Sequence, residues 1–145
     1  MSQVPIDSLN LRAKAEWRMF QMLFLILQAY IRLIYFDFYV SCGTFAALHR
    51  RVLHCRVGAQ HSSRATATEV CCAVDLACIW YWKRVLCLQR SAATACLLRS
   101  YGLSAQMVIG AQQMPFKAHA WVEIDGHVVN DKPYTPEIYV VLERC

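Results

Sequence analysis

The chain contains eight cysteines in 145 residues but no pair with Cys-x-x-Cys spacing. Zinc knuckles and thioredoxin-like redox sites both depend on that spacing, so its absence argues against either class. His49, His54 and Cys55 lie close together in the chain, but no fourth ligand follows at a suitable distance. We therefore expect neither a bound metal nor a cofactor, and we interpret all but one of the cysteines as small apolar side chains or bystanders.

Charge is also scarce, since only 17% of the residues are charged and 57% are hydrophobic. The net charge is +5, and the basic residues concentrate between Arg50 and Arg99. No basic stripe, zinc motif or stacking platform accompanies them, so we do not expect a nucleic-acid partner, and an acidic peptide fits the charge equally well. The high apolar content indicates that part of the surface meets a protein partner or a membrane face.

A secretory signal is missing from the N-terminus, because Met1–Asp7 has no basic region followed by an apolar core. We therefore expect a cytoplasmic protein with reduced thiols. The most hydrophobic stretch, Trp17 to Val40, is interrupted: the 13 residues between Arg18 and Arg32 rise about 20 Å as a helix, short of a ~30 Å hydrocarbon core. This stretch predicts a long helix that is buried or docked on a partner, with peripheral membrane contact as the alternative.

The order of the expected elements predicts an α+β fold of one compact unit, because helices come first and antiparallel strands follow. An exposed loop at residues 58–68 divides the N-terminal helical region, residues 1–60, from the catalytic core, residues 61–145. The helix expected from Cys87 to Tyr101 is followed by Gly102, a residue that commonly ends helices. The other expected elements are a helix over 68–82, capped by Thr66 or Thr68, and strands over 103–109, 118–124, 127–131 and 138–142, with loops over 110–117 and 132–137.

Three residues in the second half have the chemistry of a nucleophile, its base and an orienting carboxylate: Cys87, His119 and Asp131. A helix N-terminus and a neighbouring imidazolium both favour the thiolate form of a cysteine, and Cys87 stands at an expected helix start. Cys71 and Cys72 also lie near a helix start, but no feature of the sequence places a histidine near them. This combination predicts acyl-transfer chemistry on an amide.

His119 is the most suitable of the five histidines for a catalytic base, although a single strand histidine is more often structural. The small residues Ala118 and Ala120 flank it and leave room for a substrate. Trp121 lies on the same strand face and is expected to shield the ring from water. His127 lies beside the turn and is expected to be solvated.

The hairpin that follows decides whether Asp131 faces His119. A two-residue Asp125-Gly126 loop would pair Asp131 with Ala120 and put it on the wrong face. A three-residue loop over 124–126, with Gly126 in the left-handed conformation, would place His119 directly across from Asp131. The turn chemistry allows the three-residue loop without requiring it, and that loop is the register that the catalytic interpretation favours.

Taken together, the motifs of this region resemble those of the lasso-peptide leader peptidases, which are bacterial transglutaminase-like cysteine proteases that process lasso-peptide (microcin-type) precursors. The resemblance covers about Trp80 to Asp131. It rests on Cys87-Leu88-x-Arg90-Ser91, Leu97-Leu98-Arg99-Ser100-Tyr101-Gly102, Val108-Ile109-Gly110, Pro115-Phe116-x-Ala118-His119-Ala120-Trp121-Val122-Glu123 and Asp125-Gly126-x-Val128-Val129-Asn130-Asp131.

The resemblance implies a papain-like core in which the family's catalytic cysteine, histidine and aspartate fall on Cys87, His119 and Asp131. It implies removal of the leader from a ribosomal precursor, before a separate lasso cyclase closes the freed core peptide. Residues 1 to about 60 lack the strand-rich pattern of the leader-binding module found in fused family members. The chain therefore resembles the split type, which works with a separate leader-recognition protein.

Other functions remain open on the sequence. A transglutaminase or amidase would use the same three residues and differ only in whether an amine or water attacks the thioester. A non-catalytic interaction module that has kept the fold is a second alternative, and the presence of all three residues argues against it. A redox or zinc protein is the least favoured.

Overall fold

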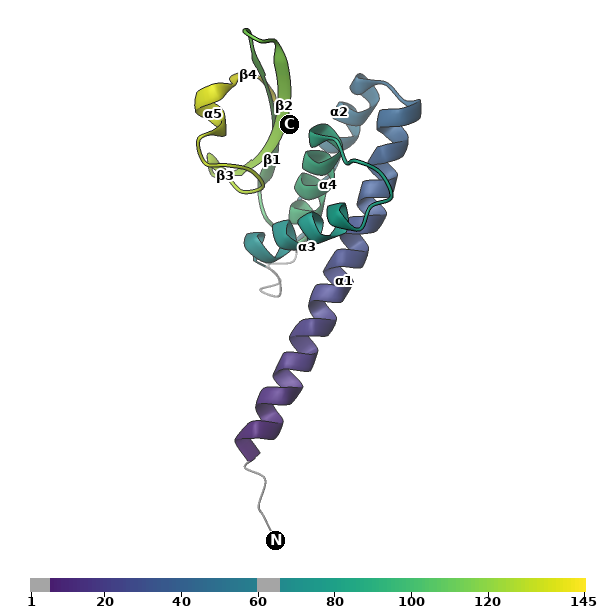
Figure 1. Ribbon diagram of the computed structural model, residues 1–145, viewed down its shortest axis with the longest axis vertical. Helices are drawn as coiled ribbons and strands as arrows, with labels where there is room; N and C mark the ends of the chain where they lie inside the picture. The colour runs from purple at the N-terminus through teal and green to yellow at the C-terminus, as the bar shows by residue number, and fades with distance from the viewer. Residues whose placement is uncertain (1–5, 60–65) are drawn as a thin grey trace.

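In the part of the chain that the structure describes, four helices are followed by an antiparallel sheet, and a short helix is inserted before its last strand (Figure 1). The computed structural model describes residues 6–59 and 66–145. The expected α+β class is confirmed, whereas the domain boundary expected at residue 60 lies outside the described residues. The elements are α1 (Ile6–Cys42), α2 (Phe45–Leu53), α3 (Ala67–Ile79), α4 (Cys87–Ser100), β1 (Ala105–Gln112), β2 (Lys117–Ile124), β3 (His127–Val128), α5 (Thr135–Ile138) and β4 (Val140–Arg144).

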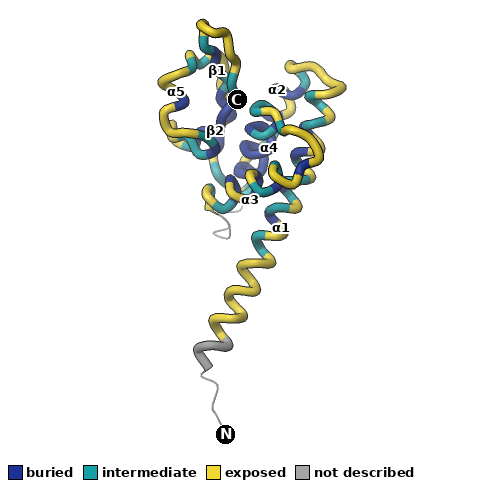
Figure 2. The backbone as a smooth tube through the Cα atoms, in the orientation of Figure 1, coloured by how far each residue is buried: buried dark blue, intermediate teal, exposed yellow. Residues whose placement is uncertain are grey.

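Helix α1 is 37 residues long and extends well beyond the expected Trp17–Val40 stretch in the N-terminal direction. Leu25, Ala29, Leu33 and Phe36 are buried at helical spacing, so the second half of α1 packs into the core. Residues 10–20 are exposed on all sides, and this part of the helix projects away from the body (Figure 2).

By length and composition, α1 from Asn10 to Cys42 also satisfies the criteria for a membrane-crossing helix, with a mean hydropathy of 1.6 in its most apolar window. The count between Arg18 and Arg32 had suggested that the stretch was too short. Core helices of soluble proteins pass the same test, but most of this window is exposed, with 22% of it buried. Helix α1 therefore carries exposed apolar surface, a feature that commonly marks interaction sites.

Helix α3 begins where its capping residues dictate. The Thr66 side chain accepts a hydrogen bond from the Glu69 N–H at 3.2 Å, and the Glu69 carboxylate accepts one from the Thr66 N–H at 2.9 Å. This capping box satisfies two N–H groups at the helix start. The expected cap at Thr66 is thus confirmed, but α3 ends at Ile79, three residues earlier than expected.

Helix α4 is the central element of the core, and most of its side chains are buried between α1, α3 and the sheet. Its run of small residues lets the sheet approach closely. Gly102, at φ +83°, ends the helix, donating to Arg99 O while Leu103 N donates to Leu98 O. The buried Arg99 guanidinium donates to the carbonyls of Ala105 and Val52 at 2.7 and 2.6 Å, which ties α4 to the start of β1 and to α2.

The sheet has the strand order β3-β2-β1-β4, and all neighbours are antiparallel. One face carries apolar residues of β1 and β2, including Met107 and Val122, and packs on α4. The opposite face carries His119, Trp121 and Glu123. Strand β1 runs through Gly110 to Gln112, so the loop expected from Gly110 was wrong in its first three residues.

The β2–β3 hairpin takes the register that the catalytic interpretation did not favour. Glu123 pairs with Val128, and the loop is the two-residue Asp125-Gly126 turn, with φ values of +50° and +79°. Two positive φ values define the type I′ turn whose twist matches that of antiparallel strands. The expected three-residue loop was therefore wrong. Strand β3 also ends at Val128 instead of continuing to Asp131.

The C-terminal segment crosses the sheet face that bears His119 and returns as an edge strand. Residues 135–138, expected in part as irregular, form the single helical turn α5. Strand β4 spans 140–144 and pairs with β1, two residues later than the expected 138–142. This return brings Tyr139 over the sheet, against His119 and Trp121.

Candidate active site

His119 and Asp131 form a direct hydrogen bond. The His119 Nε2 and Asp131 Oδ2 atoms are 2.5 Å apart, and both side chains are only partly exposed. With Asp131 ionised, its carboxylate accepts a hydrogen bond from the Nε2–H group, so the proton of a neutral ring lies on that nitrogen. Nδ1 is then left as the basic nitrogen of the imidazole.

Asp131 reaches the ring because the chain leaves the sheet before that residue. In the observed register, a continued β3 would place Asp131 opposite Ala120, on the face away from His119. The last backbone bond of this pairing joins Val129 N to Val122 O at 2.9 Å. Beyond it the chain bends, and the position of Asp131 no longer follows the strand alternation.

The surroundings of Asp131 favour its charged form. Burial raises the pKa of this carboxyl, but the hydrogen bonds from His119 and from the Lys132 backbone N–H, with the charges of His119 and Arg90, outweigh burial and hold the pKa below its usual value. The Lys132 bond measures 2.7 Å. Asp131 is therefore an ionised acceptor at neutral pH, which suits a residue that orients an imidazole.

The His119 ring lies between aromatic neighbours. It is roughly parallel to the Trp121 ring at 6.3 Å between centroids, and it contacts Tyr139 at 5.2 Å. Gly110 lies opposite His119 on β1, and a Cβ there would come within 2.8 Å of the Trp121 ring and 2.9 Å of Tyr139 Cβ. The absence of a side chain at position 110 is what lets these rings pack beside the histidine.

Trp121 is held in turn by a buried carboxylate. Its indole Nε1 donates to Glu123 Oε1 at 2.7 Å, and the other oxygen of Glu123 accepts from Arg144 of β4. Glu123 is 3% exposed, and both of its oxygens have hydrogen-bond partners. The stripe formed by His119, Trp121 and Glu123 is therefore anchored from the edge strand.

Cys87 is the first residue of α4 and is partly exposed. The capping residue, Leu86, offers no side-chain hydrogen bond, so no side chain caps the backbone N–H groups of the first turn. Among the described residues, no hydrogen bond joins the Cys87 thiol to His119 or Asp131. The structure thus brings two of the three candidate residues into contact and places the third at a helix start.

The rival Cys71 is less suited to attack. Burial, and then the charge of Asp75, raise the pKa of the Cys71 thiol to about 11, which keeps it protonated at neutral pH. Burial likewise raises the pKa of Cys78 to about 11 and that of Cys96 to about 12. Cys72 is exposed on α3 and has no histidine contact among the described residues.

Two buried polar side chains connect the helix to the strand pair. Ser91 lies one turn after Cys87 on the same face of α4, and its Oγ donates to Ala120 O at 2.9 Å. Asn130 Nδ2 donates to the same Oγ at 3.2 Å, and Asn130 Oδ1 accepts from Val122 N at 2.7 Å. Ala120 follows His119 in the chain, and Asn130 precedes Asp131.

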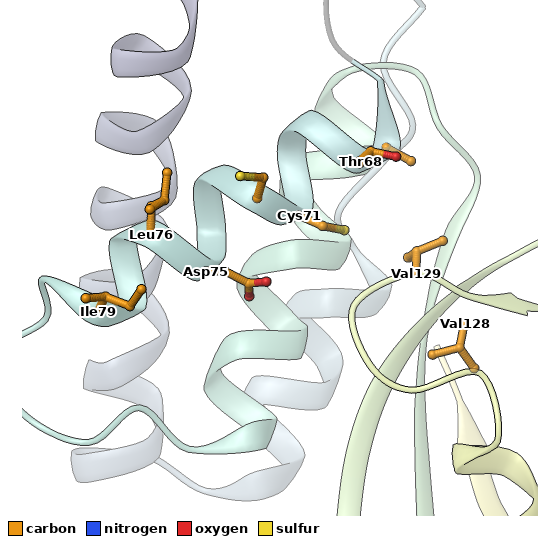
Figure 3. Close-up of a pocket in the computed structure, with 9 residues that line it drawn as sticks. Thr68, Cys71, Asp75, Leu76, Ile79, Val128 and Val129 are labelled. Atoms are coloured by element: carbon orange, nitrogen blue, oxygen red, sulfur yellow. The ribbon is translucent and has the colours of Figure 1, made fainter.

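A groove of about 500 Å³ lies beside these residues, between α3 and the hairpin (Figure 3). Cys71 and Asp75 of α3 lie across the groove from Val128 and Val129, and Cys72 also lines it. Asp75 Oδ1 accepts from Arg90 Nε and Nη2 at 3.0 and 2.6 Å, which connects the groove to the start of α4. Cys87, His119 and Asp131 do not line it.

Sequence reasoning missed three residues that support the histidine and aspartate. Ser91 and Asn130 stand inside the quoted motifs, but no periodicity assigns them a contact. Tyr139 lies beyond a turn-rich segment, and its approach to His119 depends on how α5 turns, so no local pattern predicts it. A motif serine one helical turn after the candidate nucleophile was the only available signal.

The chain belongs to the transglutaminase-like superfamily, whose family model matches residues 32–144. It is also similar to the microcin J25-processing protein McjB of Escherichia coli, with 45% identity over 47 residues. That alignment covers 32% of this chain and 23% of McjB, so the chain matches less than a quarter of that protein. Both findings support the resemblance to lasso-peptide leader peptidases. No solved structure matches the chain.

Proposed function

We propose that the protein is a cysteine peptidase that removes the leader from a lasso-peptide precursor, with Cys87 as nucleophile, His119 as base and Asp131 as orienting residue. The observation that carries this proposal is the 2.5 Å hydrogen bond between His119 Nε2 and Asp131 Oδ2, made although the hairpin register alone would separate the two. To make this bond, the chain after Val129 gives up its backbone hydrogen bonds with β2. Such a local loss of pairing is typical of functional sites.

In the proposed reaction, His119 Nδ1 takes the thiol proton and the Cys87 thiolate attacks the scissile carbonyl carbon. The uncapped N–H groups at the start of α4 are available to the oxygen that becomes negative. The C–N bond then breaks, the imidazolium gives its proton to the leaving amine, and a thioester remains. Water, deprotonated by His119, attacks the thioester and releases the leader as a carboxylate with the thiol restored.

The partners follow from the same proposal. The substrate is the precursor peptide, a separate leader-recognition protein presents it, and a lasso cyclase acts on the released core. The name of the similar protein McjB, which describes microcin processing, supports a precursor as substrate. We assign the chemistry to residues 61–145 and the docking of the partner to the helical region 1–60.

Replacement of Cys87 tests the proposal. Cys87→Ala is expected to abolish precursor cleavage while leaving the thermal unfolding midpoint nearly unchanged, because the thiol lies partly exposed at a helix start and contributes little packing. The measurement is the mass of the products after incubation with a precursor and its leader-recognition protein. Cys72→Ala is the matched control, an exposed thiol near the start of α3, and is expected to remain active. Cleavage by Cys87→Ala at the wild-type rate would refute the proposal.

A transglutaminase-type transfer is the second candidate, and the superfamily match favours it. It uses the same thioester but ends with attack by an amine instead of water. Product masses separate the two. Hydrolysis splits the precursor and adds one water across the cleaved bond, whereas transfer from a side-chain amide to an added primary amine leaves the precursor whole, adds the mass of the amine and releases one ammonia. The same incubation, repeated with excess amine, therefore decides between them.

A further inference from the structure

We infer that Ser91 and Asn130 together are positioning residues, which hold Asp131 against His119 and fix the Cys87 end of α4 to that pair. This inference rests on the proposed function for its kinetic test, although its spectroscopic test does not. We call the four bonded groups, Ser91, Asn130, Ala120 O and Val122 N, the Ser91–Asn130 link.

The link replaces the strand pairing that β3 gives up. Val122 O accepts from Val129 N, and a continued ladder would return a carbonyl of the partner strand to Val122 N. Asn130 Oδ1 occupies that place instead, at 2.7 Å. Ala120 O, two residues along the same edge of β2, would otherwise also lack a partner, and Ser91 Oγ donates to it at 2.9 Å. The polar groups at this edge of β2 are thus hydrogen-bonded, although the backbone after Val129 turns away from the strand.

This turn is what allows the His119–Asp131 bond. Because the side chain of Asn130, and not the Val129 carbonyl, pairs with the Val122 N–H, the chain after Val129 is released from the strand alternation. Asp131 can then lie on the His119 side of β2. A backbone that kept pairing through residue 131 would carry its carboxylate to the opposite face.

The link also fixes the helix. Ser91 is 1% exposed and Asn130 is 7% exposed, so both sets of hydrogen bonds are made away from water and losing either leaves buried polar groups unpaired. Cys87 is on the face of Ser91, one turn nearer the helix start. The Ser91 hydroxyl therefore fixes the start of α4, with the Cys87 thiol, relative to Ala120 and Asn130. These two residues are the chain neighbours of His119 and Asp131.

The test compares two deletions of a buried hydroxyl from the same helix. Ser91→Ala removes the link, whereas Thr94→Val removes a hydroxyl that bonds only within α4, to Arg90 O at 2.8 Å. In precursor cleavage with the leader-recognition protein present, Ser91→Ala is expected to lower kcat about 10- to 100-fold with KM changed less than about 2-fold, as expected for a displacement of reacting groups on the order of 1 Å. Thr94→Val is expected to keep kcat within about 3-fold of wild type.

Asn130 variants test the other half of the link. Asn130→Ala is expected to lower kcat as much as Ser91→Ala does. The double variant is expected to have a kcat close to that of either single variant, because each substitution already breaks the Ser91–Asn130 link. Asn130→Asp keeps the shape and can still accept from Val122 N–H, but it cannot donate to Ser91, so an intermediate kcat is expected. It also provides a readable variant if Asn130→Ala is too unstable to purify.

The second readout needs no peptidase activity. The proton shared by His119 Nε2 and Asp131 is expected far downfield in the proton NMR spectrum of the wild type and of Thr94→Val, and to shift upfield or exchange away in Asn130→Ala. Loss of this signal with a retained fold supports the link even if the wild type cleaves no precursor, in which case only the proposed function fails. An unchanged signal in Asn130→Ala, or equal kcat losses in Ser91→Ala and Thr94→Val, would overturn the inference.

Discussion

Loss of the base, His119, is expected to reduce precursor cleavage more than loss of the charge on the orienting residue, Asp131. His119→Ala removes the group that takes and returns the proton, so precursor cleavage is expected to fall as far as it does without the thiol. Asp131→Asn keeps the shape and removes only the charge that orients and stabilises the ring, so residual cleavage well above that of His119→Ala is expected. Initial rates of the two variants at neutral pH make the comparison, and equal loss in both would contradict it.

The charge of Asp131 also predicts a pH dependence of stability. Because its folded-state pKa lies below the usual value of 3.8, ionised Asp131 stabilises the fold above that pH, and this stabilisation is lost as pH falls through the lowered pKa. The thermal midpoint of the wild type is therefore expected to exceed that of Asp131→Asn near pH 6, and this difference is expected to shrink as the pH falls below 3.8. A constant difference across this range would show that the carboxylate is not preferentially charged in the folded state.

At the scale of single residues, the sequence was most informative where the chemistry is rare. The combination of a helix-start cysteine, a strand histidine and a later aspartate identified Cys87, His119 and Asp131 as candidates, and the structure brings the last two together. Residues that act through packing or hydrogen bonds, such as Tyr139 and Asn130, have no comparable signal because their partners lie on other elements.

At the scale of elements, the packing of Trp121 and Tyr139 beside His119 depends on the absence of a side chain at Gly110. Gly110→Ala is expected to destabilise the protein by about 1–3 kcal/mol, the usual cost of an added methyl in a packed site, because the new Cβ would meet Trp121 and Tyr139. Since these rings flank His119, cleavage is expected to fall together with stability. Chemical denaturation and initial rates measure the two effects.

A second glycine provides the control for this substitution. Gly126 has a φ of +79° and no atom within 4 Å of an added Cβ, so Gly126→Asn, which tolerates that conformation, is expected to cost less than about 1 kcal/mol. If Gly110→Ala cost no more than Gly126→Asn, the rings would have room to move and the close packing would not constrain His119.

Element boundaries could be predicted where a local signal exists. Thr66 and Gly102 marked ends of α3 and α4, because capping depends on neighbouring residues alone. The hairpin register could not be predicted, since Asp125-Gly126 fits either the two-residue or the three-residue loop. The strand through Gly110 was missed because glycine normally favours a loop, and only the packing of Trp121 explains it.

At the scale of the whole molecule, the exposed part of α1 is the expected docking surface for the leader-recognition protein. Phe20, Leu23 and Leu27 are each more than half exposed and lie on one face at helical spacing. Replacing all three by Glu is expected to weaken partner-stimulated cleavage at least 10-fold, while alkylation of Cys87 by iodoacetamide, followed by peptide mass spectrometry, stays at the wild-type rate.

Two controls separate docking from packing. Val140→Glu changes an exposed apolar residue of β4, remote from α1 in sequence, and is expected to leave partner stimulation unchanged. Leu33→Ala changes a fully buried residue of the same helix and is expected to lower the thermal midpoint instead. If the triple Glu variant lost cleavage and thiol alkylation together, its face would belong to the core. If it lost neither, the partner would dock elsewhere.

The projection of α1 sets a minimum reach for any peptide delivered along it. From Asn10 to Leu25, the first described residue that the body buries, a helix rises about 22 Å. An extended peptide advances about 3.3 Å per residue, so about seven residues are needed to cover that length. A leader bound at the far end of α1 would therefore need at least about seven residues between its bound segment and the scissile bond. The length of α1 would then limit which peptide bond can reach the active site.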